Sequence, residues 1–533
     1  MIEAKERKWI WILSLIVLAA TTLPYLIGYW TQGSHWVFNG FVFGVEDGNS
    51  YIAKMLEGAS GDWMFRTPYT AYPQTGAFAF FPYLLLGKLS AGAAQHAQLV
   101  FLFQFFRWVG GFLLIFATYD FAALFLKKIS NRRLATALVI LGGGLGWLSV
   151  LGLSFLWQGR IPLEFYSPET YGFLSLLGLP HLEVARACLL WGIKGYLVNL
   201  DDFSIPRAAK NGGLWLVMGL FQPLTVLIGW IVIGCHVLIT GILKNWKSLK
   251  LRCLIRSHQK PLITFVIMVL VSSPIVIYTL ISFQVDPFLR GWTDQNLILS
   301  PPIGDYLLAF LNILPLSIAG IVVVVKSWKW DAALLVIWLL IFPVLAYAPY
   351  NLQRRLPEAI WVAIVILGLI YIEEKLVSRQ KLVRAWLMTA FLSSLLFFVG
   401  AILTVTKPDA PLFATTPEID AFTALKTTAL KNDVVLASFN IANELPAWLP
   451  VRTVVGHGPE SINSIILIPR VEAFFKDSTP DNDRLSLIKE FDIKYIILGP
   501  DEQTTDSWKP QQSNFAHLIF QNASYKIYGI VSQ

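Results

Sequence analysis

The sequence predicts an all-α polytopic membrane domain of about eleven transmembrane helices, residues 1–405, followed by a small extracytoplasmic α/β domain, residues 406–533. Three observations predict this. Of the 533 residues, 55% are hydrophobic and 14% are charged, against about 25% charged in soluble domains. Apolar runs long enough to cross a bilayer recur through the first 405 residues, with basic residues in the short loops between them. In the tail, strand-like runs alternate with helical segments.

The charge is divided unevenly along the chain. Residues 406–533 hold 11 Lys and Arg against 15 Asp and Glu, so the tail is net −4. The whole chain is +8, so the preceding residues carry +12, concentrated in short loops. This distribution orients a membrane protein and argues against a nucleic-acid partner.

Ten apolar stretches are candidate spans, and the first has no cleavage site after it, so it is predicted to be retained. The stretches are 9–29, 97–126, 134–157, 181–200, 213–243, 261–283, 304–326, 331–349, 357–372 and 385–405. The stretch 213–243 is long and contains Gln222-Pro223, so it is either one span or two short spans hinged at the proline.

Basic loops set the predicted orientation of the chain in the membrane. Residues 1–8, 127–133, 244–260 and 373–384 are predicted to be cytoplasmic. An even number of crossings must then separate 134 from 244, which favours two crossings in 213–243 and eleven spans. In the alternative, 181–200 is interfacial and 213–243 crosses once.

Either count leaves the same segments outside the cell. The first external loop, 30–96, is predicted to face the extracytoplasmic side, together with 158–180, 284–303, 350–356 and the tail. Glu46-Asp47 and "YNLQRRLPE" (350–358) are therefore predicted to share one side of the membrane. The tail strands are predicted at 433–438, 452–456, 494–500 and 525–530, with helices near 441–449, 461–475 and 483–491.

Two adjacent acids, Glu46 and Asp47, follow the first span. The residues after them, including Tyr51, have small and apolar side chains at helical spacing, which predicts an amphipathic helix on the membrane surface that ends near Gly58 and Gly61. Asp47 then either caps this helix or takes part in catalysis. The sequence leaves both open.

Two cations, Arg354 and Arg355, lie in a short external turn where few are expected. Arginine forks bind phosphate in a bidentate manner, which predicts a phosphate ligand. The alternative is that both side chains reach lipid headgroups from the ends of spans.

Further ionisable residues lie within apolar segments. His181, Glu183 and Arg186 are close together in "LPHLEVARA", and Arg107 needs a polar partner, for which Glu183 and Asp120 are candidates. His181 alone is more often structural than catalytic. In the tail, "HGPES" (457–461) shows no recognisable partner set and predicts only turn or capping chemistry.

The layout resembles the GT-C superfamily of multi-spanning glycosyltransferases, which includes protein O-mannosyltransferases and bacterial aminoarabinose-to-lipid A transferases. The resembling residues are Glu46-Asp47 followed by Tyr51, the run "GDWMFRTPYT" and "FFPYLLLGKL", Arg107, "LPHLEVA" and "NLQRRLPE". The tail's "VVLASFN", "ELPAW", "RTVVGHGPES" and "KYIILGP" are similar to the external domain of a bacterial branch of that superfamily.

The resemblance implies transfer of a sugar from a polyprenyl-phosphate donor to an acceptor hydroxyl on the extracytoplasmic face. It assigns the catalytic carboxylate to Asp47, with Glu46 second. Substrate-binding roles fall on Arg354, Arg355, His181, Glu183, Arg107 and Tyr51. Because "EDGNSY" differs from the acid-acid-x-Tyr-Tyr pattern of better-known members, the need for a divalent cation such as Mg²⁺ or Mn²⁺ stays open. The acceptor, a glycan, a lipid or a protein, stays open too.

Two other functions fit the same residues. A transporter or flippase for a lipid-linked saccharide would use the arginine pair without chemistry and Gln222-Pro223 as a hinge. A noncatalytic envelope scaffold would bind a partner through the tail. The long external loop and the tail favour the enzyme.

Overall fold

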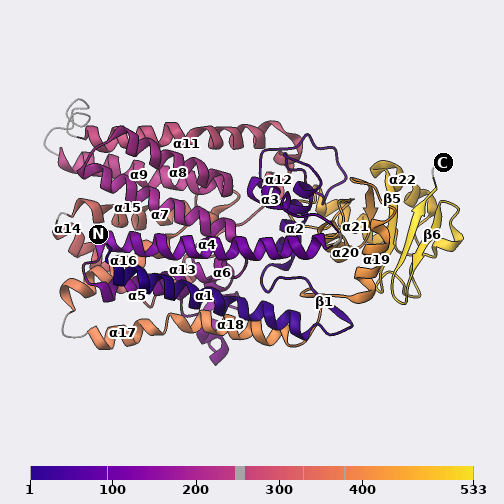
Figure 1. Ribbon diagram of the computed structural model, residues 1–533, viewed down its shortest axis with the longest axis horizontal. Coiled ribbons are helices and arrows are strands. Elements are labelled where there is room, and N and C mark those ends of the chain that lie inside the picture. Colours follow the sequence, from indigo (N-terminus) through magenta and orange to yellow (C-terminus); the bar gives the residue numbers. More distant parts are fainter. Residues whose placement is uncertain (1, 93, 246–257, 328, 377–379, 532–533) are drawn as a thin grey trace. The chain divides into compact units, whose positions relative to one another are not determined.

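A computed structural model describes residues 2–92, 94–245, 258–327, 329–376 and 380–531 (Figure 1). The chain packs as two compact units. Unit 1 comprises 1–22, 106–280 and 298–400, and unit 2 comprises 23–105, 281–297 and 401–533. The predicted cytoplasmic loop 244–260 falls largely on 246–257, which lie outside the described residues.

Unit 1 is helical. Its helices are α5 (Ile129–Leu141), α6 (Gly172–Gly178), α7 (Pro180–Asp201), α8 (Ile205–Phe221), α9 (Pro223–Lys244), α13 (Ile303–Phe310), α14 (Leu314–Lys326), α15 (Trp330–Ala346), α16 (Ile360–Lys375) and α17 (Gln380–Met388). Short 3-10 turns are η1 (Gly146–Leu151), η2 (Ser154–Trp157), η3 (Leu163–Phe165) and η4 (Gln353–Arg355). Four helices contribute residues to both units: α1 (Ala4–Thr31), α4 (Gln95–Phe125), α11 (Gln259–Val285) and α18 (Phe391–Val405).

Helix α16 forms the core of unit 1. Every residue from Ile360 to Ile370 is buried, and α5, α14 and α15 pack against it. A helix that is apolar all round is stable only when it is enclosed in this way.

Among the described residues, five helical segments are long and apolar enough to cross a membrane. They are α1, α4, α9, α11 and the segment Lys381–Val405. Helices α13 and α14 could together form a sixth span, although the pair is bent by 83°. The chain therefore has the apolar helices of an integral membrane protein, and the count of about eleven spans remains a prediction.

Two predicted spans differ from the structure. The stretch 134–157 is not one helix, because α5 ends at Leu141, before Gly142, Gly143 and Gly144, and 3-10 turns follow. Glycine is among the poorest helix formers, so three in succession end the helix. The stretch 304–326 is broken into α13 and α14.

The break predicted at Gln222-Pro223 is confirmed. Helix α8 ends at Phe221 and α9 begins at Pro223, because proline has no N–H to continue the hydrogen bonds of the preceding helix. Whether 213–243 crosses the membrane once or twice stays a prediction.

Unit 2 is larger than the tail. Residues 23–105 and 281–297 pack with 401–533, and strand β1 (Trp36–Phe38) pairs with β2 (Phe413–Thr415). The other helices of unit 2 are α2 (Val45–Ala59), α3 (Phe81–Gly87), α12 (Pro287–Gln295), α19 (Thr416–Lys426), α20 (Phe439–Glu444), α21 (Ser464–Phe474) and α22 (Asp481–Phe491), with the turns η6 (Leu445–Ala447) and η7 (Pro510–Gln512). The boundary at residue 405 between a transmembrane domain and an extracytoplasmic domain remains a prediction.

A five-stranded sheet organises the tail (Figure 1), in the order β4-β3-β5-β7-β6. The strands are β3 (Val434–Leu436), β4 (Arg452–Thr453), β5 (Ile493–Leu498), β6 (Ala516–Gln521) and β7 (Lys526–Ile530). Strand β3 is parallel to β4 and β5, whereas β7 is antiparallel to β5 and β6. The four predicted strands are confirmed, and β6 and α19 were not predicted.

Both faces of this sheet are covered at strand β3. Val434 and Leu436 pack with α21 and α22, while Val435 packs with α19 and α20 on the opposite face. Alternate residues of a strand point to opposite faces, so a continuous apolar run such as "VVL" suits a strand buried on both sides.

Candidate functional site

The acids Glu46 and Asp47 lie in the first turn of α2, where the helix dipole favours negative charge. Asp47 is not the N-cap residue of the helix: the N-cap is Gly44, in the left-handed conformation at φ 59°, which has no side chain to act as a cap. The carboxylates are held instead by the tail. The backbone N–H of Gly458 donates to Glu46 Oε1 at 2.7 Å, and His457 Nε2 lies 3.3 Å from Asp47 Oδ1.

Helix α2 is not a surface helix, so that prediction is wrong. Eleven of its 15 residues are buried, and it packs against α3, α20 and η6. Gly58 lies within α2, and a Cβ there would collide with the backbone of Leu84 in α3. The glycine therefore permits α2 and α3 to pack closely. The enclosure of α2 fixes the two acids at its start.

A turn of the tail, residues 456–461, presents His457 and Gly458. The hydroxyl of Ser461 accepts hydrogen bonds from the backbone N–H groups of Gly456 and His457, both at 3.0 Å. Gln295, the last residue of α12, donates to the carbonyl oxygens of Pro459 and Ser461 at 2.7 and 2.9 Å. These bonds fix the turn.

Glu460 of this turn forms a buried ion pair with Lys54 of α2. Lys54 Nζ is 2.6 Å from Glu460 Oε1, and their side chains are 1% and 3% exposed. Thr67 donates to the other oxygen of Glu460 at 2.5 Å, and the hydroxyl of Ser50 bonds both members of the pair. Lys54 also lies over the ring of Phe80, 4.5 Å from its centroid. Since an unpaired buried charge is costly, each member requires the other.

The charges of this region shift its pKa values. Burial alone lowers the pKa of His457, but Glu460 and Asp47 outweigh burial and raise it above 6.5. Burial raises the pKa of Glu460, but Lys54 and His457 outweigh burial and lower it. Burial and, to a smaller extent, Asp62 raise the pKa of Glu57 to about 8.

Tyr51, predicted to bind substrate, lies in an aromatic core. Its ring stacks on Tyr83 with centroids 4.7 Å apart and on Phe103 at 5.9 Å. The side chain is 8% exposed. A direct substrate contact by Tyr51 stays a prediction.

The arginine pair of unit 1 is half-buried in η4. Arg355 Nε lies 3.3 Å from Glu169 Oε1, and the Arg354 guanidinium lies 4.8 Å from the ring centroid of Tyr166. The Nε of Arg354 is buried and has no hydrogen-bond partner among the described residues, whereas that of Arg355 has the ion-pair contact with Glu169. An anion is the partner that the Arg354 donor suits.

Another arginine, Arg160, lies near the pair in the same unit. It donates to both oxygens of Asp305 at 2.8 Å. The positive charges of Arg160 and Arg354 both act on the hydroxyl of Tyr166. The sequence analysis did not single out Arg160 or Asp305, because neither stands in a pattern.

The remaining predicted residues are held inside unit 1. Arg107 donates to the hydroxyls of Thr21 and Thr22 and to the carbonyl of Leu176 at 2.7–3.1 Å. The alternative partner Asp120 is 3.1 Å from Lys194.

In helix α7, Arg186 pairs with Glu358 at 2.8 Å, both almost fully buried. Glu183 is buried too, and neither of its carboxylate oxygens has a hydrogen-bond partner among the described residues. His181 is half-buried in the first turn of this helix. Substrate binding by these residues stays a prediction.

The structure thus brings Glu46 and Asp47 together with His457, Glu460 and Lys54 in unit 2. His457 and Glu460 stand in "HGPES", for which the sequence predicted only turn or capping chemistry, and Lys54 carried no signal in the sequence. Arg354 and Arg355 belong to unit 1, and their approach to Asp47 remains a prediction. Among the described residues, no group of three or more His, Cys, Asp or Glu side chains is arranged to hold a metal ion.

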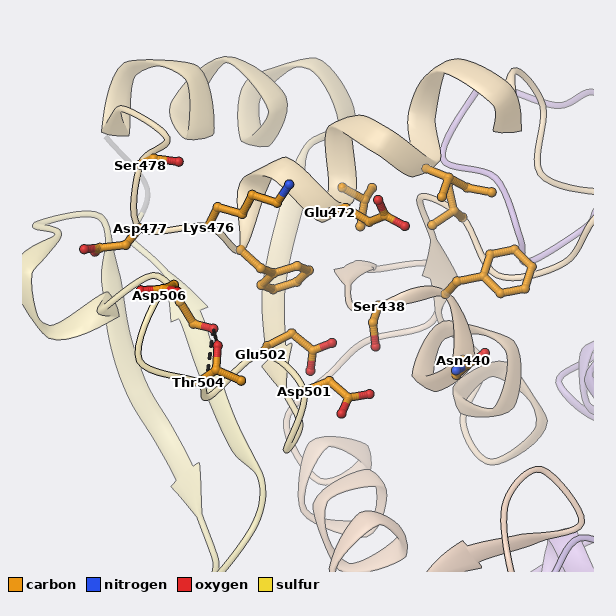
Figure 2. A pocket seen from close by; sticks show the side chains of 16 residues that line it. Ser438, Asn440, Glu472, Lys476, Asp477, Ser478, Asp501, Glu502, Thr504 and Asp506 are labelled. Atoms are coloured by element: carbon orange, nitrogen blue, oxygen red, sulfur yellow. Dashed lines mark hydrogen bonds between the residues drawn. The ribbon is translucent and has the colours of Figure 1, made fainter.

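A separate cavity of about 910 Å³ lies in the tail, next to the carboxyl ends of the parallel strands (Figure 2). Its charged lining residues are Glu472, Lys476, Asp477, Asp501, Glu502 and Asp506. Neither Asp47 nor His457 lines it, so it is distinct from the carboxylate site.

Solved structures are similar to this chain, whereas no protein-family model and no curated protein sequence matches it. The apo oligosaccharyltransferase of Archaeoglobus fulgidus is 13% identical with a TM-score of 0.56, over 93% of this chain and 70% of that chain. The same organism's oligosaccharyltransferase AglB, in complex with an inhibitory peptide and a dolichol-phosphate, gives 13% identity and a TM-score of 0.50 over 94% and 70%. ArnT from Cupriavidus metallidurans in the apo state aligns over 98% of both chains, with 13% identity and a TM-score of 0.49. At these identities the likeness shows a shared fold.

Proposed function

We propose that this chain, which shares its fold with oligosaccharyltransferase structures, is a membrane glycosyltransferase of the GT-C superfamily. It would transfer a sugar from a polyprenyl-phosphate donor to an acceptor hydroxyl on the extracytoplasmic face of the bacterial inner membrane. The observation that carries the proposal is the position of Asp47. This carboxylate is 58% exposed, while the turn 456–461 and α2, which hold it, are mostly buried. An exposed carboxylate on a rigid support suits a catalytic base.

The donor phosphate is assigned to Arg354 and Arg355. Support comes from the buried Nε of Arg354, which has no hydrogen-bond partner among the described residues, and from the similar AglB structure, which contains a dolichol-phosphate. Glu169 orients Arg355, and the ring of Tyr166 supports Arg354, so both forks lose little freedom when they bind an anion.

The reaction is one displacement. The acceptor oxygen attacks the anomeric carbon of the donor, its proton passes to the Asp47 carboxylate, and the bond from the anomeric carbon to the phosphate oxygen breaks. The polyprenyl phosphate leaves with a gain of negative charge, which Arg354 and Arg355 stabilise. A positioned base contributes about 10²–10⁴-fold to such a step.

A metal requirement is a separate matter. A similar oligosaccharyltransferase structure contains Zn and sulfate. Among the described residues of this chain, no three His, Cys, Asp or Glu side chains are arranged to hold a metal ion. Whether Mg²⁺ or Mn²⁺ is needed is read from the same assay with and without a chelator.

The test is transfer from a radiolabelled polyprenyl-phosphate sugar in membranes that contain the purified chain. Asp47→Asn is expected to lower transfer about 10²–10⁴-fold while donor binding stays unchanged. The matched control is Asp420→Asn, an exposed residue of α19, which should transfer at the wild-type rate. Normal transfer by Asp47→Asn would refute the assignment.

A transporter or flippase for a lipid-linked saccharide is the second candidate. It is favoured by the broken helices α8–α9 and α13–α14, since interrupted helices line the binding sites of many transporters. Such a protein would move the lipid-linked sugar across the membrane of a vesicle, and the wild type and Asp47→Asn would do so at the same rate.

A further inference from the structure

The ring of His457 lies between two carboxylates. Its Nε2 is 3.3 Å from Asp47 Oδ1, and its Nδ1 is 4.0 Å from Glu460 Oε1. The side chain is 7% exposed, and one face of the ring packs on Tyr69, with centroids 5.4 Å apart. A ring held in this way has one orientation.

The second carboxylate belongs to the buried pair. Glu460 is compensated by Lys54 and bonded by Thr67 and Ser50, so its charge stays in place beside Nδ1. A row of neighbouring charged side chains therefore connects a fully buried cation to an exposed carboxylate, in the order Lys54, Glu460, His457 and Asp47.

We propose that His457 is a positioning residue for Asp47, and that the turn 456–461 is the means by which the C-terminal domain takes part in sugar transfer. The proposal rests on the function proposed above. His457 donates through Nε2–H to Asp47 Oδ1, and the adjacent N–H of Gly458 donates to Glu46 Oε1. One turn of the tail thereby fixes both acids of α2.

The alternative is that His457 only fills space beside Tyr69. Two observations oppose it. Burial disfavours a charged imidazole, yet both ring nitrogens face carboxylates. The hydrogen bonds of Ser461 and Gln295 also fix the turn independently of His457, so the turn does not need this side chain for its shape.

The first experiment separates positioning from folding. His457→Ala is expected to lower kcat about tenfold to a hundredfold with the donor KM unchanged, because a misplaced base slows the chemical step and not donor binding. His457→Gln keeps an N–H donor near Nε2 and should recover part of the rate. His517→Gln, an exposed histidine of β6, is the matched control and should act like wild type.

The second experiment follows pH. The groups that face His457 are Asp47 and Glu460, with Tyr69 on its ring face and Lys54 behind Glu460. In wild type, kcat should change as pH rises through the His457 pKa above 6.5, since the imidazolium loses its proton there. His457→Gln should lack this inflection.

A third measurement needs no activity. Deuterium exchange at the C2 position of His457, followed by mass spectrometry, gives its pKa, which Asp47→Asn should lower because one of the two facing carboxylates is removed. Wild-type kcat and an unchanged pH inflection in His457→Gln and His457→Ala, with Asp47→Asn inactive, would overturn the positioning role and leave the transferase intact. Coupled titration in a chain that transfers no sugar would instead refute the proposed function.

Discussion

Each unit of the chain contains a fully buried ion pair and, in addition, charged side chains that are more exposed. The exposed charge is negative in unit 2 and positive in unit 1. In unit 2 the pair Lys54–Glu460 has side chains 1% and 3% exposed, and the exposed group near it is the Asp47 carboxylate. In unit 1 the pair Arg186–Glu358 is equally buried, and the half-exposed groups in the same unit are the guanidinium forks of Arg354 and Arg355.

The buried pairs and the exposed charges have different roles. A fully buried ion pair is satisfied by its partner and has no access to substrate. The exposed member of each group determines what it can do: a carboxylate accepts a proton, and a guanidinium binds an anion. The buried pairs should therefore control stability, and the exposed groups should control rate and affinity.

The largest expected effect on stability comes from breaking the buried pair of unit 2. Lys54→Met leaves Glu460 charged and unpaired, which should lower the free energy of unfolding by about 3–5 kcal/mol. Urea unfolding of the detergent-solubilised chain, followed by circular dichroism, measures this. The control is Glu490→Gln, in the exposed pair Arg470–Glu490 at 2.6 Å, which should cost less than about 1 kcal/mol.

Replacing both members sharpens that result. Lys54→Met with Glu460→Leu removes both buried charges, so most of the lost stability should return. Transfer should nevertheless stay low, because the carboxylate that faces His457 Nδ1 is gone. A double variant as unstable as Lys54→Met alone would contradict the ion-pair explanation.

An intermediate effect is expected on donor affinity. Arg354→Gln removes a charged donor from the proposed phosphate site, so binding of undecaprenyl phosphate should weaken about tenfold to a hundredfold. Binding in detergent micelles, followed by tryptophan fluorescence, checks this. Arg7→Gln removes an exposed cation elsewhere and should bind as wild type does. Unchanged affinity in Arg354→Gln would favour contact with lipid headgroups.

A further expected effect is a change in how stability depends on pH. Burial and Asp62 raise the pKa of Glu57 from 4.5 to about 8, so the folded chain holds this proton more tightly than the unfolded chain does. Unfolding therefore releases a proton between these pH values, and stability should fall as pH rises from about 4.5 to 8. Glu57→Gln should flatten this fall in urea unfolding series. An equally steep fall in the variant would contradict the assigned pKa.

Local patterns in the sequence predicted much of the fold. Pro223 marked the break between α8 and α9, and four strands of the tail followed from apolar runs such as "VVL". The run Gly142–Gly144 also carried a signal, the end of α5, that hydropathy alone hides. Helix α2 was located correctly, but its burial depends on α3 and α20, which local periodicity does not reveal.

The candidate site was only half predictable. Glu46 and Asp47 stood out because acids are rare beside apolar segments. Their partner His457 lies 410 residues away, in a turn without any period, and Lys54 looks like an ordinary helix residue until Glu460 is placed beside it. Pairing at such a distance is decided by the packing of the tail on α2, for which a single sequence holds no signal.

Sidedness tests the account most directly, because a single extracytoplasmic reaction requires the arginine pair and the tail to face the same compartment. Single cysteines at Gln353, Asp420 and Lys127, in a chain whose own cysteines are replaced by serine, would be exposed to an impermeant thiol reagent in right-side-out membrane vesicles. The account predicts labelling at 353 and 420 in sealed vesicles and at 127 only after permeabilisation. Labelling at 353 only after permeabilisation would place the arginine pair in the cytoplasm and contradict the account.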